Sequence, residues 1–105
     1  MLNRIVLMGR LCADPQLRQT QNGKPVANFT LAVDRDHNRE ETDFVDIVAW
    51  NGTAEFVNKY FVKGQMAVVT GRLQARKYEK DGANRTSYEV IADSVYFGDS
   101  KKKGD

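Results

Sequence analysis

Apolar and polar side chains alternate along most of this chain, which is the pattern of β-strands with one buried face. Five segments carry the alternation, at residues 3–11, 26–34, 42–52, 65–79 and 85–97. Only the segment 53–64 breaks it, because its apolar residues recur at the three- and four-residue spacing of a helix. Its apolar residues are Phe56, Val57, Tyr60 and Phe61, its candidate N-caps are Asn51 and Thr53, and Lys63 and Gly64 suit its end.

The inward-facing positions of the first four segments predict a single core. They are Ile5, Leu7, Gly9 and Leu11; Ala27, Phe29, Leu31 and Val33; Val45, Ile47 and Ala49; and Ala67, Val69, Gly71, Leu73 and Ala75. Glycine inside a strand indicates a bulge or a sharp bend, which curls a sheet into a barrel. The element order therefore predicts an all-β fold, a five-stranded OB-fold Greek-key barrel with one α-helix between strands 3 and 4.

The connections and the domain limits follow from turn residues. The stretch 13–25 contains Asp-Pro and Asn-Gly and is expected to be a connection, residues 35–42 a polar hairpin loop, and residues 80–84 a turn around Asp-Gly. At this length the barrel is one domain, which we place at residues 1–98. The polar residues 99–105 cannot bury themselves and are expected to be a short disordered tail.

Several classes of protein are excluded by what the sequence lacks. Cys12 is the only cysteine and His37 the only histidine, so no disulfide, zinc cage or nucleophile–histidine pair can form within one chain. We therefore expect no enzymatic activity, no metal and no cofactor. No run of 18 or more apolar residues occurs, so we expect no membrane contact and a cytoplasmic protein.

Two predicted strands carry unusual side chains opposite their core stripes. Segment 42–52 points Phe44, Asp46, Val48 and Trp50 outward, and segment 65–79 points Arg72, Arg76 and Tyr78 outward. If both sets meet on one flank, aromatic rings can stack on bases and guanidinium groups can contact phosphates. That combination suits an unpaired strand, since the bases of a duplex already stack on one another. The alternative is that the three aromatics are buried under a loop, a terminus or a subunit interface.

From about Asn3 to Phe97 the chain resembles the bacterial single-stranded DNA-binding protein family. The resemblance is carried by NRIVLMGRL, DPQLR, NGKPVANFTLAV, TDFVDIVAW, AEFVNKYFVKGQMAVVTGRLQARKY and YEVIADSV in this order and spacing. It implies an OB-fold protomer of a homotetramer that winds single-stranded DNA over its surface. It also implies roles in DNA replication, recombination and repair.

The resemblance also implies which residues bind DNA. The stacking positions of the family fall on Phe44, Trp50 and Tyr78, and a fourth, commonly aromatic position falls on His37, which is smaller and titrates near neutral pH. The matching basic positions are Arg4, Arg18, Lys63, Arg72, Arg76 and Lys77.

Family members typically continue through a long linker to an acidic tip that recruits replication proteins, whereas this sequence ends in KKKGD. Either it is a naturally short member or it was trimmed before the tail, and in both cases we do not expect tail-mediated recruitment.

The expected function is sequence-tolerant binding of single-stranded DNA, which it would protect. Two alternatives stay open: an OB module that binds proteins within a replication or recombination assembly, and a cold-shock-like module that binds RNA.

Overall fold

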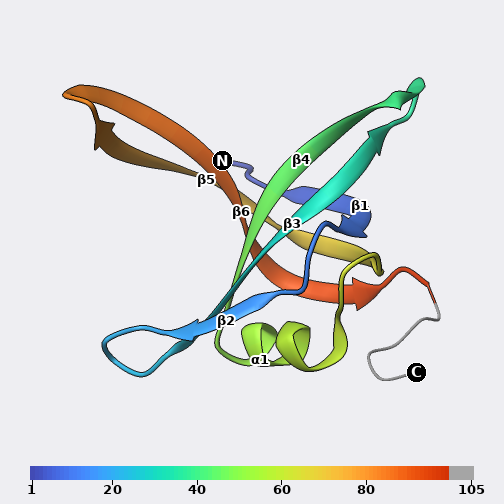
Figure 1. Ribbon diagram of the computed structural model, residues 1–105, viewed down its shortest axis with the longest axis horizontal. Coiled ribbons are helices and arrows are strands. Elements are labelled where there is room, and N and C mark those ends of the chain that lie inside the picture. The colour runs from blue at the N-terminus through green and yellow to red at the C-terminus, as the bar shows by residue number, and fades with distance from the viewer. Residues whose placement is uncertain (100–105) are drawn as a thin grey trace.

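The computed structural model describes residues 1–99, and residues 100–105 of the expected tail lie outside the described residues. The described part contains six strands and one helix (Figure 1). In chain order they are β1 (Ile5–Leu11), β2 (Gln16–Gln19), β3 (Pro25–Arg35), β4 (Asn38–Trp50), α1 (Asn51–Tyr60), β5 (Met66–Lys80) and β6 (Ala83–Phe97). Within residues 1–99 no helix has the length and apolar character needed to cross a membrane.

Five of the six strands close into a barrel. Hydrogen-bonded neighbours follow the order β1-β5-β6-β4-β3, and a further pairing between β1 and β3 completes the ring. β4 and β6 run parallel, whereas the other neighbouring strands are antiparallel. Because β2 lies outside the ring, α1 stands between the third and the fourth barrel strands in chain order. The predicted OB-fold barrel with its Greek-key strand order is confirmed.

The two glycines predicted to bend strands lie where backbones approach closely. A Cβ atom at Gly9 would lie 2.5 Å from the carbonyl oxygen of Ala32, close to where β1 leaves β5 to pair with β3. A Cβ atom at Gly71 would lie 2.1 Å from the carbonyl oxygen of Ile91, where the register of β5 and β6 shifts. Only glycine fits at such distances, so these two positions allow the ring to close.

The core fills the barrel and is closed at one end by α1 (Figure 1). Most inward residues of β3 and β4 are buried as predicted, whereas Val33 and Val45 are only partly buried against the core. Val57 and the following Phe61 bring the apolar side of the helix into the same cluster. The Phe61 ring stacks on the ring of Phe97, with centroids 4.8 Å apart and planes 9° from parallel. Burial of Phe61 and its stacking on the partly exposed ring of Phe97 fix the end of the helix across the barrel.

Two hairpins extend beyond the barrel and diverge at the top of Figure 1. We call them the β3–β4 arm, residues 34–43, and the β5–β6 arm, residues 73–88. The expected hairpin is present, but its loop is much shorter than residues 35–42, because β3 continues to Arg35 and β4 already begins at Asn38. Leu73 and Ala75 were expected in the core, but both are exposed because β5 has left the barrel at that point.

Two further local expectations are wrong. Residues Gln16–Gln19 form β2, which pairs with the start of β3, instead of a plain connection. Neither Asn51 nor Thr53 caps α1, because the helix follows β4 directly and its N-cap position is Trp50, without a side-chain cap hydrogen bond. Thr53 instead donates its hydroxyl to the carbonyl oxygen of Asp93 at 3.4 Å.

Candidate nucleic-acid interface

The strand register shows which outward side chains meet, because cross-strand partners in a sheet share one face. Val48 of β4 lies between Asn28 of β3 and Ile91 of β6, and Ile91 in turn lies opposite Arg72 of β5. One continuous surface therefore joins the outward sets of β4 and β5. We call it the outer face; it comprises Asn28, Thr30, Phe44, Asp46, Val48, Trp50, Arg72, Gln74, Arg76, Tyr78, Glu89 and Ile91.

The three aromatic side chains of the outer face are open to solvent. Phe44 is 70% exposed, Trp50 40% and Tyr78 42%. Phe44 lies at the base of the β3–β4 arm, Trp50 at the end of β4, and Tyr78 on the β5–β6 arm. No loop or terminus within residues 1–99 covers them, so an apolar ring face is available at three places along this surface.

The outer face is not open everywhere. Val48 is only 6% exposed although its side chain belongs to the outward set of β4. Its cross-strand neighbours Asn28 and Ile91 flank it on both sides, and it lies outside the main core cluster. The outer face is therefore closed to solvent at Val48, between the exposed aromatic rings.

Three arginines bring positive charge to this surface. Arg18 of β2 lies opposite Val26, which lies opposite Trp50, and its Nε donates to the Asn28 side-chain oxygen at 3.3 Å. Arg72 donates to the Gln74 side-chain oxygen at 2.8 Å. Within residues 1–99 neither they nor Arg76 forms an ion pair, so all three keep their charge available for phosphates.

Arg4 reaches the margin of the outer face from the residue before β1. Its guanidinium forms an ion pair with the Asp93 carboxylate on β6 at 2.8 Å, with both side chains more than half exposed. The pair holds Arg4 in place but offsets part of its charge.

Three residues expected at the site lie apart from the others. His37 is in the turn at the tip of the β3–β4 arm, away from Trp50 and the barrel. Lys63 is exposed in the connection after α1, where its backbone N–H donates to the Asp14 carboxylate at 2.8 Å. Lys77 alternates with Arg76 and Tyr78 along β5 and so faces the other side of the β5–β6 arm.

The two arms differ in charge. Between residues 34 and 43 the sequence has five acidic residues and two arginines, whereas residues 73–88 have four basic residues and two acidic ones, Glu79 and Asp81.

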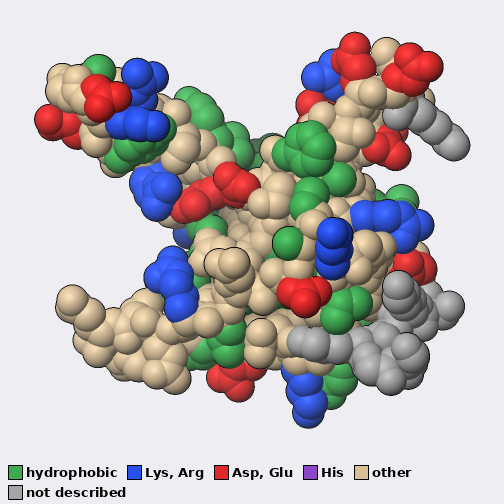
Figure 2. Space-filling model, in the orientation of Figure 1, with side chains coloured by type: hydrophobic (Ala, Val, Ile, Leu, Met, Phe, Trp, Pro, Cys, Tyr) green, Lys and Arg blue, Asp and Glu red, His purple; other side chains and the backbone are tan. Residues whose placement is uncertain are grey.

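 The β5–β6 arm therefore carries a net positive charge and the β3–β4 arm a net negative charge. Figure 2 shows the two arms standing apart, with acidic side chains gathered at the tip of the β3–β4 arm. A polyanion is therefore attracted to the β5–β6 arm and repelled from the tip that carries His37.

Arg35 organises the acidic residues of the β3–β4 arm. Its guanidinium contacts both carboxylate oxygens of Asp43, at 3.0 and 3.2 Å, and also pairs with Glu41. The hydrogen bonds donated by Arg35 hold the pKa of Asp43 below its ordinary value, against the opposing effect of desolvation and with the support of the Arg35 charge. These contacts lie within the arm and keep its two strands paired in solvent.

No set of metal ligands is present within residues 1–99, since no three His, Cys, Asp or Glu side chains gather in a way that could hold an ion. Cys12 is a free thiol of intermediate burial. The chemistry of the outer face is thus stacking, hydrogen bonding and charge.

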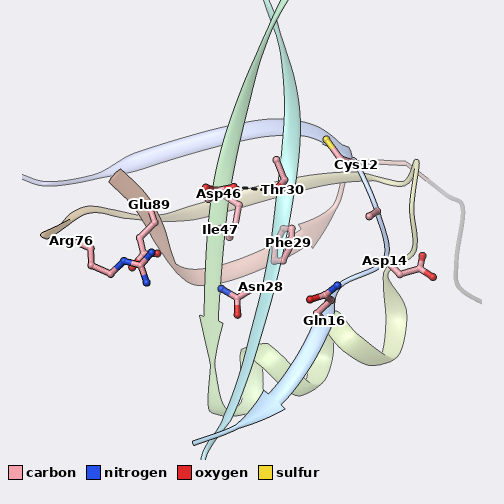
Figure 3. A pocket seen from close by; sticks show the side chains of 11 residues that line it. Cys12, Asp14, Gln16, Asn28, Phe29, Thr30, Asp46, Ile47, Arg76 and Glu89 are labelled. Atoms are coloured by element: carbon pink, nitrogen blue, oxygen red, sulfur yellow. Dashed lines mark hydrogen bonds between the residues drawn. The ribbon is translucent and has the colours of Figure 1, made fainter. Parts of the chain in front are cut away.

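The polar residues between the aromatics were not among the predicted site residues. Asn28, Thr30 and Glu89 line a groove beside Asp46 (Figure 3). The alternation of segment 26–34 already pointed Asn28 and Thr30 outward, and polar residues at outward positions were the available signal. Their closeness to Asp46 depends on the pairing of β3 with β4, which the alternation alone does not specify.

Comparisons with known proteins agree with this geometry. The sequence profile of the "Single-strand binding protein family" matches residues 2–98. A "Single-stranded DNA-binding protein" of Fusobacterium nucleatum is 46% identical over 106 residues, which cover 95% of this chain and 69% of that protein. "Single-stranded DNA-binding protein 1" of Staphylococcus aureus is 50% identical over 110 residues, which cover all of this chain and 70% of that protein.

Proposed function

The chain belongs to the single-strand binding protein family, and we propose on this basis that it binds single-stranded DNA without strong sequence preference. The observation that carries the proposal is the strand register that joins the exposed aromatics of β4 and β5 to three unpaired arginines on one face. A base can stack on each ring while the guanidinium groups contact the phosphates.

The outer face suits an unpaired strand better than a duplex. Phe44, Trp50 and Tyr78 offer ring faces, which a base can use only when it is not already stacked between its own neighbours. Stacking is tolerant of sequence because every base has a π-face. Arg18, Arg72 and Arg76 add charge that a backbone of any sequence can use.

Other residues expected at the site would be used at the margins. We assign Arg4 a phosphate contact that competes with Asp93. His37, Lys63 and Lys77 would contact only a strand that continues past the outer face, along the arms or over the connection after α1. The acidic surroundings of His37 make it the weakest of these contacts.

We further propose that the protein forms a homotetramer, protects single strands during replication, recombination and repair, has no catalytic activity, and works in the cytoplasm at the nucleoid without contacting membranes. Membership of a family named for single-strand binding supports a protective, non-catalytic role. Val6 and Met8 support the assembly, because both are large apolar side chains exposed on β1.

The test is a binding titration with a fluorescently labelled dT oligonucleotide, followed by competition. Unlabelled single-stranded DNA should displace the probe, and duplex DNA of the same length should compete far less well. Displacement by matched RNA at equal or lower concentration would favour the cold-shock-like alternative. Failure of every nucleic acid to bind would favour the alternative of a protein-binding OB module.

A further inference from the structure

Asp46 is the one acidic side chain on the outward side of β4 between the stacking positions. It lies two residues after Phe44 and four before Trp50, so its Cα is about 7 Å from the first and about 13 Å from the second. One carboxylate oxygen, Oδ1, accepts a hydrogen bond from the Thr30 hydroxyl at 3.0 Å. Within residues 1–99 Asp46 forms no ion pair, so its charge is not neutralised locally.

The carboxylate of Asp46 faces a groove of the size that a nucleobase needs. The groove has a volume of about 360 Å³, and its polar lining includes Asn28, Thr30, Arg76 and Glu89 as well as Asp46. In Figure 3 the Asp46–Thr30 pair lies in the middle of the groove and Arg76 and Glu89 at one end. A base that stacks on a neighbouring ring can therefore turn its edge toward an acceptor that is already held in place.

Base edges differ in what they offer to a carboxylate. An ionised carboxylate only accepts hydrogen bonds. Cytosine presents its N4 amino group, which is the usual partner of Asp and Glu, whereas thymine presents the O4 acceptor at the equivalent position. The carboxylate is thus favourable beside cytosine and unfavourable beside thymine, independently of how well either base stacks.

We propose that Asp46, held by Thr30, reads the edge of the base in this groove and favours amino-bearing bases, cytosine first, over thymine. The proposal rests on the proposed function and refines it, because it adds a base preference at one position to a binder that otherwise tolerates any sequence. A carboxylate that served only to weaken binding, by repelling phosphates, would act equally on every base.

The experiment compares the dissociation constants of dC and dT octamers for the unaltered protein and for Asp46→Asn. The asparagine has the same shape and can still accept from Thr30, but it removes the charge and adds an N–H₂ donor that suits thymine O4. We expect dT to bind more tightly and dC to gain little or to bind more weakly. The ratio of the two constants should move toward thymine by about 5-fold or more.

The change in the dC/dT ratio separates recognition of the base edge from the intrinsic stacking of each base, since the substitution leaves stacking unchanged. Asp43→Asn is the matched control: it removes one charge from the same strand, but Asp43 alternates to the opposite side of β4 and pairs with Arg35. Its ratio should equal that of the unaltered protein.

If Asp46→Asn tightens dC and dT equally, Asp46 acts through charge alone, and the inference is wrong while the proposed function stands. If neither octamer binds the unaltered protein, the proposed function fails and the inference fails with it.

Discussion

Raising the salt concentration should weaken DNA binding to an extent that the outer face allows us to calculate. Arg18, Arg72 and Arg76 are free of ion pairs within residues 1–99, and Arg4 shares its charge with Asp93. We therefore expect each chain to neutralise three to four phosphates of a bound strand. For a single strand this predicts a slope of log affinity against log salt of about −2 to −3, which is about a 20- to 50-fold loss between roughly 50 and 200 mM salt.

The assay is fluorescence anisotropy of a labelled dT octamer, which is short enough for one barrel, at four or more salt concentrations. Arg76→Gln should flatten the slope by about 0.7, the share of one phosphate contact. Lys59→Gln is the matched control, because Lys59 lies in the last turn of α1, away from the outer face. A slope near zero, or an equal change in both variants, would refute the assignment of these arginines to the strand.

Three further results are expected. Gly71→Ala should lower the stability by about 1–3 kcal/mol, seen as a fall in the melting temperature, because its Cβ would overlap the neighbouring backbone. Gly52→Ala is the control and should be tolerated, because open space surrounds that position. Equal melting temperatures of the two variants would contradict the close approach at Gly71. Because the pKa of Asp43 is lowered in the folded state, this carboxylate stabilises the fold above its unfolded pKa of about 3.9, and the stabilisation is lost as the pH falls through the folded pKa. Arg35→Gln should therefore reduce the acid dependence of unfolding. An unshifted Asp43 carboxyl titration by NMR in the unaltered protein would count against this. Light scattering should give a tetramer that Met8→Lys breaks into smaller species, and a monomeric mass of the unaltered protein at micromolar concentration would rule the tetramer out.

The barrel could be predicted from the sequence because its strands are half-buried. Ala27, Phe29 and Leu31 alternate with polar residues, and the same period recurs in the segment of Ile47 and Ala49. Burial on one side alone produces this period, so it identifies strands and core residues together. The helix was predictable for the same reason, from a change of period.

The arms and β2 could not be predicted in the same way. Arg35 and Asn38 bound a two-residue turn between strands that are exposed on both sides, so their sequence has no apolar alternation. β2 is exposed along its whole length, so no alternation of apolar and polar residues marks the strand that pairs with β3. Backbone hydrogen bonds to an existing strand are sufficient there, and such bonds leave little trace in side-chain pattern.

The candidate site was predictable residue by residue but not as a surface. Alternation pointed Phe44 and Trp50 outward on one strand and Arg72 on another. Whether they meet depends on the parallel pairing of β4 with β6 and on the register that places Ile91 between Val48 and Arg72. That pairing joins segments about 40 residues apart and is set by the closure of the whole barrel.

The most direct test of base stacking uses the intrinsic fluorescence of Trp50, the only tryptophan in the chain. Its ring is 40% exposed, so a base can reach it without unfolding the protein. Titration with poly-dT should quench the emission strongly and saturably, in step with the anisotropy of a labelled strand. Trp50→Ala should weaken binding by about 1–3 kcal/mol with little change in melting temperature. Binding by anisotropy with unchanged tryptophan emission, or a Trp50→Ala protein that unfolds while each folded molecule keeps its DNA affinity, would contradict the account.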